Sequence, residues 1–561
     1  MTRSRAIGAL LAAAALLAGA LQLAPTSPAQ ADAGEGSPGT PRLEATALAA
    51  GEYFTCALVS SGAVRCWGAG DSGQLAQGNP SNVGDDSGES SVAVPLPGPA
   101  RAVAAGYGTA CAILDSGELR CWGSGIAGAL ATGNQLAVGD NPGETPVRID
   151  LGPGRTATAV TIGSDNACAI LDTGQVRCWG SGSFGMLAQG NTNAVGDNPG
   201  EAPLPVSLPR PAVAIAASWS SVCAVLDDGR LYCWGGGTHG QLMQGNTTIV
   251  GDQPGEVPVP VDTGGHVVLA ITSGADFYCA VYDDHQVRCW GDNTYGQLAR
   301  SGTADFGDGP GETNVGPIAL PAGRSAVAVS AGAYHACALL DDGQLRCWGR
   351  SEDGALGQGN TEMIGDQPGE TTVGVDVGGA ARALVSGGYF TCAVTASGVR
   401  CWGYNLDGQL GQGSHVPTYG TALGEVPRLL PPIGLGGESV GRDTDHDGVR
   451  DAADGCPGIA GGKADGCPEA TLKGRKVVID TILLKKAASA SCPKKATVTI
   501  RTKGTKGPIR ATRLLRAKAD PDGCRVRGKV RLPAKPKKTA TVKVSVSGKK
   551  LKTKHLVAVR L

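Results

Sequence analysis

Short apolar runs that alternate with polar residues recur along most of the chain, and most pairs of runs flank a turn that contains glycine. In residues 111–122, two such runs lie on either side of Asp115, Ser116 and Gly117. Gly117 can take the positive φ that reverses a chain, so this stretch predicts a β-hairpin. The same hairpin, ending in Cys-Trp-Gly, recurs at residues 56–68, 111–123, 168–180, 223–235, 279–291, 337–349 and 392–403. Seven copies of a β unit with a mean spacing of 56 residues predict an all-β fold, a seven-bladed β-propeller.

The cysteines predict that each blade is held by a disulfide. The two cysteines of a hairpin lie ten residues apart, or nine in the seventh copy, and are nearly symmetric about the turn. Opposed positions on paired strands lie about 4.5–5.5 Å apart, which is within the Cα separation that a disulfide accepts. Zinc is the alternative, but zinc sites usually place their cysteines closer together and add Cys or His ligands nearby. The predicted pairs are Cys56–Cys66, Cys111–Cys121, Cys168–Cys178, Cys223–Cys233, Cys279–Cys289, Cys337–Cys347 and Cys392–Cys401.

The glycine-rich segments after Cys-Trp-Gly resemble a known repeat. Residues 290–298 and 402–413 are similar to the Trp-Gly-x-Asn-x-x-Gly-Gln-Leu-Gly signature of the regulator of chromosome condensation repeat family, and residues 330–339 resemble its Gly-x-x-His-Thr-x-Ala-Leu strand. The resemblance covers about residues 46–433. It implies a seven-bladed propeller with four strands in each blade. It does not imply the nuclear exchange activity known in that family, which needs a partner and a compartment that this chain lacks.

The first residues predict export. Arg3 and Arg5 precede an almost wholly apolar run, residues 6–24, and Ala29 and Ala31 supply the small residues of a cleavage site, so residues 1–31 are predicted to be a secretory signal peptide. An uncleaved signal anchor is the alternative. No later apolar stretch approaches the length of a bilayer crossing, and eighteen cysteines agree with an oxidising compartment. We expect a secreted, extracellular protein.

The propeller is predicted to span residues 43–437, after a linker at 32–42. It starts with a strand at 45–51 that lacks the half-repeat before it, and residues 425–431 supply a half-repeat without a following hairpin. We therefore expect the two ends to complete one blade together and so close the ring, which removes exposed sheet edges.

A second repeated motif, Gly-Asp-x-x-Gly-Glu, predicts a ring of carboxylates on one face of the propeller. The seventh copy has Thr421 in place of the aspartate. This ring could bind cations or a basic partner; the alternative is that each Asp bonds its own turn while the Glu is solvated. The candidate acidic residues are Asp85, Glu89, Asp140, Glu144, Asp197, Glu201, Asp252, Glu256, Asp308, Glu312, Asp366 and Glu370.

Residues 438–469 contain a pattern of oxygen ligands typical of a calcium loop. Aspartate oxygens at positions 1, 3, 5, 9 and 12, with a backbone carbonyl at 7 and glycine at 6, suit a hard cation. The run resembles a thrombospondin type 3 repeat, and Cys456 and Cys467 could close its following loop. An acidic linker without calcium is the alternative. The predicted ligands are Asp443, Asp445, Asp447, Val449, Asp451 and Asp454.

Residues 470–561 reverse the charge of the chain. From Thr471 onward there are 27 lysine and arginine residues against three aspartates, a net charge of +24, whereas the whole chain carries −1. Alternation around Val542, Val544 and Val546 predicts strands with one basic face, and Cys492 with Cys524 would pin a small β-sandwich. The segment has no Phe, Tyr or Trp, which argues against single-stranded nucleic acid. Cell-envelope polymers or anionic lipids are candidate partners; a merely solvated basic face is the alternative.

These features favour a secreted, non-enzymatic binding or scaffold protein. We expect a monomer whose propeller loops bind a protein or an envelope polymer, without sequence-specific nucleic-acid binding, and whose basic domain could hold it at the cell surface. The alternatives are a structural envelope protein and an enzyme inhibitor, because the family includes secreted bacterial propellers that inhibit β-lactamases. A hydrolase is disfavoured because the seven histidines lie in different contexts and no nucleophile motif accompanies them.

Overall fold

The computed structural model describes residues 44–89, 91–370 and 372–435, and further along it describes seven strands between Ala470 and Arg560. The chain divides into two compact units, 1–437 and 438–561. The predicted signal peptide (1–31), linker (32–42) and calcium repeat (438–469) lie outside the described residues, so these three stay predictions.

The hairpin of the second blade shows how the sequence sets the local fold. Strand β6 (Thr109–Leu114) pairs antiparallel with β7 (Leu119–Gly123), and Cys111 lies directly opposite Cys121. Gly117 has a φ of 83°, and its N–H donates to the Leu114 carbonyl oxygen at 2.8 Å. Glycine reaches this φ without steric cost, so it closes the turn. The Cα atoms of the two cysteines lie 4.0 Å apart and their side chains form a disulfide.

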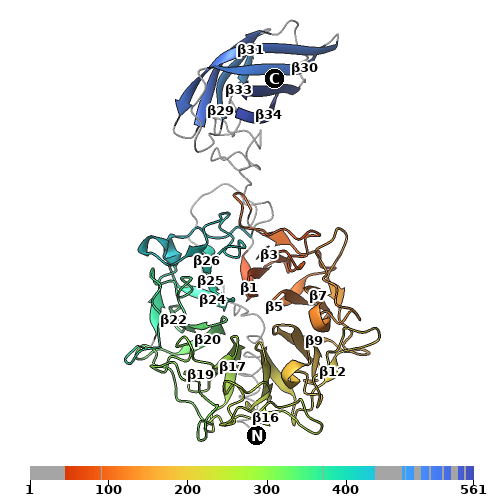
Figure 1. The fold of residues 1–561 in the computed structure, drawn as a ribbon, viewed down its shortest axis with the longest axis vertical. Coiled ribbons are helices and arrows are strands. Elements are labelled where there is room, and N and C mark those ends of the chain that lie inside the picture. Colours follow the sequence, from red (N-terminus) through yellow and green to blue (C-terminus); the bar gives the residue numbers. More distant parts are fainter. Residues whose placement is uncertain are drawn as a thin grey trace, which may run out of the picture. The chain divides into compact units, whose positions relative to one another are not determined.

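Seven antiparallel sheets are arranged around one axis (Figure 1), which confirms the predicted seven-bladed propeller. Six have four strands in sequence order, and the fifth has three. The blades are β1 (Ala45–Ala50), β2 (Phe54–Val59), β3 (Val64–Gly68) and β4 (Val92–Ala93); β5 (Ala100–Ala105), β6, β7 and β8 (Val147–Arg148); β9 (Ala157–Ile162), β10 (Asn166–Leu171), β11 (Val176–Gly180) and β12 (Leu204–Pro205); β13 (Ala212–Ala217), β14 (Ser221–Leu226), β15 (Leu231–Gly235) and β16 (Val259–Pro260); β17 (Val268–Ser273), β18 (Phe277–Tyr282) and β19 (Val287–Gly291); β20 (Ala326–Ala331), β21 (His335–Leu340), β22 (Leu345–Gly349) and β23 (Val373–Val375); and β24 (Ala381–Ser386), β25 (Phe390–Thr395), β26 (Gly398–Tyr404) and β27 (Thr418–Tyr419).

Helical structure in the described propeller is limited to four short 3-10 turns. They are η1 (Ile126–Gly128), η2 (Ser183–Gly185), η3 (Leu423–Glu425) and η4 (Pro427–Leu429). Within the described residues, no helix is long and apolar enough to cross a membrane.

A buried tryptophan joins each blade to the one before it. The seven indole side chains of the Cys-Trp-Gly signatures are fully buried, and each Nε1–H donates to a backbone carbonyl oxygen of the preceding blade at 2.8–3.0 Å. A buried indole N–H needs such an acceptor, so the tryptophan fixes the position of the neighbouring blade as well as filling the core. The donor and acceptor pairs are Trp67 and Gln409, Trp122 and Gln74, Trp179 and Ala129, Trp234 and Met186, Trp290 and Gln241, Trp348 and Gln297, and Trp402 and Ala355.

The ring closes without a shared blade. The N–H of Ile433 donates to the Val399 carbonyl oxygen at 2.8 Å, so the last described segment lies on the seventh blade, while the first blade is built wholly from residues 45–93. The prediction that both ends complete one blade is therefore wrong. Closure instead uses the same contacts as every other seam, including a hydrogen bond from the Gly413 N–H to the Gly84 carbonyl oxygen at 2.8 Å. In Figure 1 the red first blade lies beside the cyan seventh blade.

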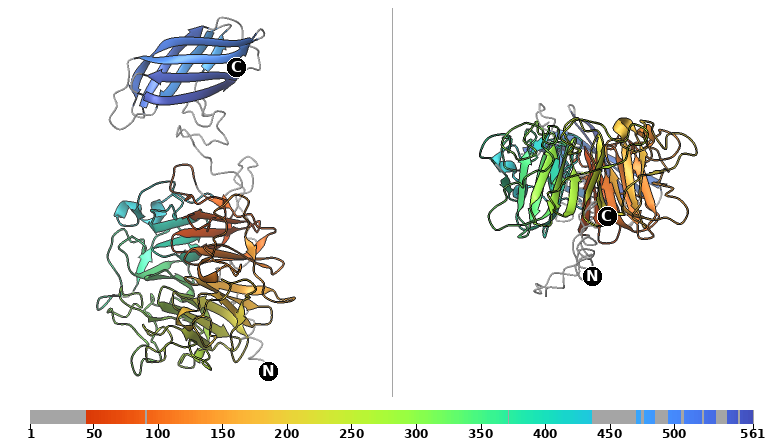
Figure 2. Two further views of the ribbon diagram at one scale, coloured as in Figure 1. Left: turned by 45° about the vertical axis from the view of Figure 1, so that its right-hand side comes forward. Right: turned by 90° about the horizontal axis from the view of Figure 1, so that it is seen from below.

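The first strands of the seven blades surround a central channel. Its wall consists mainly of Ala, Gly, Val, Ile and Ser residues, and the cavity volume is about 200 Å³. Small side chains allow seven strands to approach the axis. The right-hand view of Figure 2 shows the blades edge-on, with connecting loops at both faces.

The second unit forms one antiparallel sheet of seven strands, in the order β28-β29-β32-β31-β30-β33-β34. The two packed sheets of the predicted sandwich stay a prediction, as does the Cys492–Cys524 pair, because Cys492 lies outside the described residues. The strands are β28 (Ala470–Lys473), β29 (Lys476–Leu484), β30 (Lys495–Gly504), β31 (Gly507–Asp520), β32 (Gly523–Arg531), β33 (Thr541–Gly548) and β34 (Leu551–Arg560).

Candidate binding face at the channel mouth

One end of the channel is framed by the turns that join the first and second strands of the blades. In every blade, the residue two positions after the signature tryptophan donates its backbone N–H to the second tip residue of this turn, as from Arg350 to Tyr334 at 2.9 Å. The loop after each tryptophan is thereby held beside the turn. We call the face formed by these turns and loops the channel mouth. Its tip pairs are Glu52-Tyr53, Tyr107-Gly108, Ser164-Asp165, Trp219-Ser220, Ala275-Asp276, Ala333-Tyr334 and Gly388-Tyr389.

Aromatic side chains gather at the channel mouth. Six of the ten tyrosines of the chain lie there, together with Trp219, the only tryptophan outside the signatures. Tyr107 is 51 % exposed and the other rings are half-buried. Half-buried aromatic rings at a surface are typical of binding sites, because they offer large contact area at low entropic cost. The ring centroids of the aromatic cluster are separated by 6.1 Å for Trp219–Tyr334, 5.1 Å for Tyr295–Tyr334, 6.1 Å for Tyr334–Tyr389, 6.2 Å for Tyr53–Tyr389 and 5.9 Å for Tyr53–Tyr404.

An arginine is built into this cluster. The Arg350 guanidinium carbon lies 5.0 Å from the Tyr389 ring centroid and 5.7 Å from that of Tyr295, which places it in cation–π range of both rings. The same guanidinium donates to the carboxylates of Glu352 and Asp353, each at 2.5 Å. Burial raises the pKa of Tyr334 to about 12, so this hydroxyl stays neutral at physiological pH. The cluster therefore combines apolar ring faces with polar hydroxyl and guanidinium groups.

Glu52 is the buried acid of the mouth. Its side chain is 8 % exposed and lines the channel, and its Oε2 atom has no hydrogen-bond partner among the residues that the structure describes. Burial raises the pKa of this carboxyl. The Glu52 side chain lies against Gly388, where a Cβ atom would come within 2.6 Å of the Glu52 Cγ, so glycine leaves room for it. An unpartnered carboxylate oxygen at a cavity wall is costly unless a ligand or water satisfies it.

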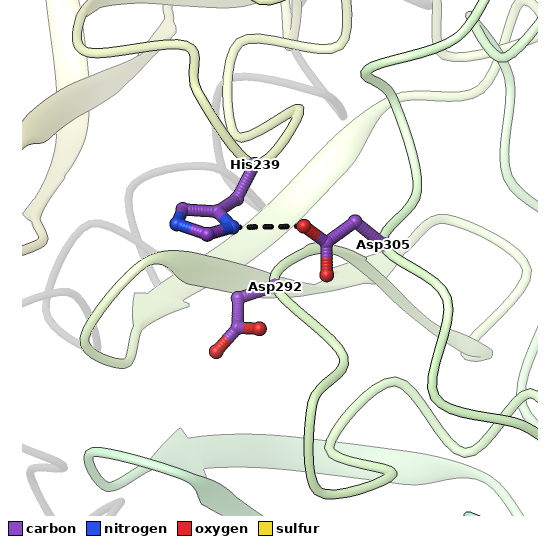
Figure 3. A group of neighbouring side chains, drawn as sticks. All are labelled: His239, Asp292 and Asp305. Carbon is purple, nitrogen blue, oxygen red and sulfur yellow. Dashed lines mark hydrogen bonds and ion pairs between the residues drawn. The ribbon is translucent and has the colours of Figure 1, made fainter.

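A histidine and two aspartates meet beside the mouth (Figure 3). The His239 Nδ1 atom lies 2.8 Å from the Asp305 Oδ2 atom, and Asp292 lies below this pair. Their ligand atoms lie within 4.8 Å of one another, a spacing that a metal ion could bridge. Each aspartate is already bonded within the protein: Asp305 accepts from the Asn293 N–H, and Asp292 accepts from Thr294 and Gln297. The bond between His239 and Asp305 thus links the fourth and fifth blades.

The repeated carboxylates have a structural role in the blades. The Glu89, Glu144, Glu201, Glu256, Glu312 and Glu370 carboxylates each accept two backbone N–H bonds within their own Gly-Asp turn, at 2.8–3.4 Å. The alternative that the Glu is solvated is therefore wrong, because the Glu carboxylate bonds the backbone of the turn. The glycine before each Asp accepts a backbone hydrogen bond from the preceding blade, as in Gly133 N–H to Gly196 O at 2.9 Å. The turns thus fasten neighbouring blades, and their use as a binding face stays a prediction.

Seven disulfides join the cysteine pairs of the blade hairpins, and all fourteen cysteines are buried. The predicted calcium ligands and the Cys456–Cys467 loop lie outside the described residues. The aromatic cluster was not predicted, although aligning the seven strand-joining turns would have shown Tyr or Trp at five of them.

The family comparison agrees with this repeat geometry. A model of the regulator of chromosome condensation (RCC1) repeat matches residues 45–74, 100–128, 157–185, 212–241, 268–297, 326–355 and 381–409. The chain carries seven RCC1 repeats. Each match begins near the first strand of a blade and ends in the loop after the signature tryptophan, so these repeats contain every turn of the channel mouth.

Known proteins share this repeat region. The ultraviolet-B receptor UVR8 of Arabidopsis thaliana is 28 % identical over 407 residues, which cover 70 % of this chain and 83 % of the receptor. The human E3 ubiquitin-protein ligase HERC2 is also 28 % identical, but the match covers 69 % of this chain and only 8 % of HERC2. The crystal structure of Prp20p from Saccharomyces cerevisiae, described together with its binding to Gsp1p and histones, matches with a TM-score of 0.53 at 19 % identity, over 73 % of this chain and 88 % of Prp20p. That likeness concerns the fold.

Proposed function

We propose that the protein is a non-enzymatic binding protein that recognises another protein through the channel mouth. The observation that carries this proposal is the aromatic cluster, which gathers six of the ten tyrosines and Trp219 on one face. The relatives support a binding role, since Prp20p is described with protein partners. The half-buried rings, with an arginine between them, have the composition of a protein-interface hot spot.

The setting of this function is a further part of the proposal. The apolar first residues and the cysteine content support export, and the basic residues 470–561 support retention on an anionic envelope. Calcium at Asp443, Asp445, Asp447, Val449, Asp451 and Asp454 would stiffen the segment between the two units. Equilibrium dialysis of the purified protein against calcium, with and without D447N, tests that site.

The binding role is tested by capturing partners from a culture of the producing organism. We expect W219A and Y334A to lower retention of the captured partner at least about ten-fold, because each removes a central ring of the cluster. The matched control is Y232A, which removes a half-buried tyrosine from β15, outside the channel mouth. Equal retention by wild type, W219A and Y334A would contradict the proposal. Loss of binding by Y232A alone would locate the interface elsewhere.

A further inference from the structure

The charges around the channel mouth leave one buried acid without a counter-ion. Within residues 44–89, 91–370 and 372–435, the Oε2 atom of Glu52 has no hydrogen-bond partner, and its side chain is more than nine-tenths buried at the channel wall. Arg350, the guanidinium of the aromatic cluster, is bonded to Glu352 and Asp353 instead. Further carboxylates stand at the same face on Asp165 and Asp276, the tips of the third and fifth blades.

Aromatic rings border this acid. Tyr53 follows Glu52 in the same turn and lies 6.2 Å from Tyr389, centroid to centroid. Tyr107 lines the same channel as Glu52, and Tyr389 follows Gly388, whose backbone N–H donates to the Glu52 carbonyl oxygen at 3.2 Å. Trp219 lines the same channel. A carboxylate among aromatic faces is the arrangement that binds an organic cation, since the rings attract the charge and contact its alkyl stem.

The composition of the propeller indicates that such a cation comes from outside residues 44–435. Residues 44–435 contain no lysine, so no lysine of the propeller itself can reach Glu52. We propose that the channel mouth binds a lysine side chain of a partner protein, with the Glu52 carboxylate as counter-ion of the ammonium group and Tyr53, Tyr107 and Trp219 around its stem. This inference rests on the proposed binding function and names the group that the mouth recognises.

Trp219 provides a direct readout for this site. The seven signature tryptophans are fully buried, whereas Trp219 is half-buried, so acrylamide quenching reports mainly on Trp219. The experiment titrates the full chain with the peptide Gly-Lys-Gly, blocked by acetylation at its N-terminus and amidation at its C-terminus, and separately with the same blocked peptide acetylated at the lysine Nζ atom. We expect a saturable decrease in quenching with the free lysine peptide at millimolar concentration and no saturation with the acetylated one, because acetylation removes the charge.

Two isosteric variants test the role of the acid. E52Q should weaken binding of the lysine peptide at least ten-fold, whereas E362Q, which removes an exposed carboxylate from a loop of the sixth blade, should bind like wild type. Equal responses to the two peptides in wild type, or unchanged binding by E52Q, overturn the inference. The wild-type comparison stands even if E52Q does not fold. Failure of the proposed protein-binding function gives a different result, because W219A and Y334A would then leave the capture of partner proteins unaffected.

Discussion

His335 shows how one buried residue connects two blades. It is 1 % exposed, and its Nε2 atom lies 2.9 Å from the Thr391 hydroxyl oxygen of the seventh blade. That hydroxyl donates its one hydrogen to the Ala355 carbonyl oxygen at 3.1 Å. It can therefore only accept the bond with His335, so the Nε2 atom must carry the ring proton. Burial lowers the pKa of His335 to about 3. The neutral imidazole with its proton on Nε2 is therefore the form that the fold requires.

This pKa predicts an acid-sensitive contribution to stability. Between about pH 3 and pH 6.5 the His335 imidazole is protonated in the unfolded chain and neutral in the folded one. The contribution of His335 to the free energy of unfolding is therefore complete above about pH 6.5 and declines as the pH falls toward 3. The slope is about 1.4 kcal/mol per pH unit. We expect the free energy of urea unfolding to fall more steeply from pH 6.5 to 4.5 in wild type than in H335Q. Parallel curves for the two proteins would contradict this assignment.

At the scale of the element, the Gly-Asp turn depends on one carboxylate. The Glu201 Oε2 atom accepts the Gly196 N–H at 2.8 Å and the Asn198 N–H at 3.1 Å. The hydrogen bond from Gly196 lowers the pKa of Glu201, so the stabilisation is present above the unfolded pKa and lost as the pH falls through the folded one. We expect E201Q to lose about 1 kcal/mol at pH 7 and nothing below the folded pKa. Urea unfolding at both pH values checks this, with E362Q as the control.

A local measurement separates this role from general destabilisation. Amide hydrogen exchange at Gly196 should be faster in E201Q, while exchange at Gly139, the same position of the second blade, should stay unchanged because Glu144 still bonds it at 2.8 Å. Equal acceleration at both glycines would mean that the Glu201 carboxylate does not act on its own turn alone.

The sequence predicts these elements well where they repeat and poorly where they differ. Cys111 and Trp122 occupy positions that recur in every blade, and Gly117 occupies one that recurs in all but the fifth, where His285 takes the positive φ, so spacing alone predicts hairpin, disulfide and propeller. Glu52 and Trp219 stand at turn positions that change residue type from blade to blade, and only the closed ring brings them to one channel. The sequence also does not show which carboxylate bonds the Gly-Asp turns, because Asp and Glu are both able to accept a backbone N–H. Only the distances in the structure decide this.

At the scale of the whole molecule, the ring depends on many equivalent seams. The seam between the seventh and first blades uses a tryptophan bond, Trp67 to Gln409 at 2.9 Å, that has the same form as the bond from Trp234 to Met186 at 2.8 Å. No strand of the described propeller is shared between blades. Each blade is therefore a local unit made of consecutive strands, and the stability of the ring combines the stability of the blades with that of the seams.

The disulfides contribute to every one of these local units, which predicts that the propeller cannot fold when reduced. Each closes a loop of about ten residues, and the chain-entropy model gives roughly 2–3 kcal/mol for such a loop. Seven of them sum to roughly 14–21 kcal/mol, which reaches or exceeds the 5–15 kcal/mol by which a typical domain is stable. All fourteen cysteines are buried, so a reductant should act slowly on the native protein and quickly in denaturant.

We expect protein reduced in denaturant and then diluted into buffer with reductant to show no cooperative thermal transition by circular dichroism. The matched control is the same cycle without reductant, which should recover the transition. Thiol titration verifies that the chain is fully reduced. If the reduced chain still unfolds cooperatively, at the same temperature as the oxidised protein, then packing of the blades and their tryptophan seams suffices to hold the ring.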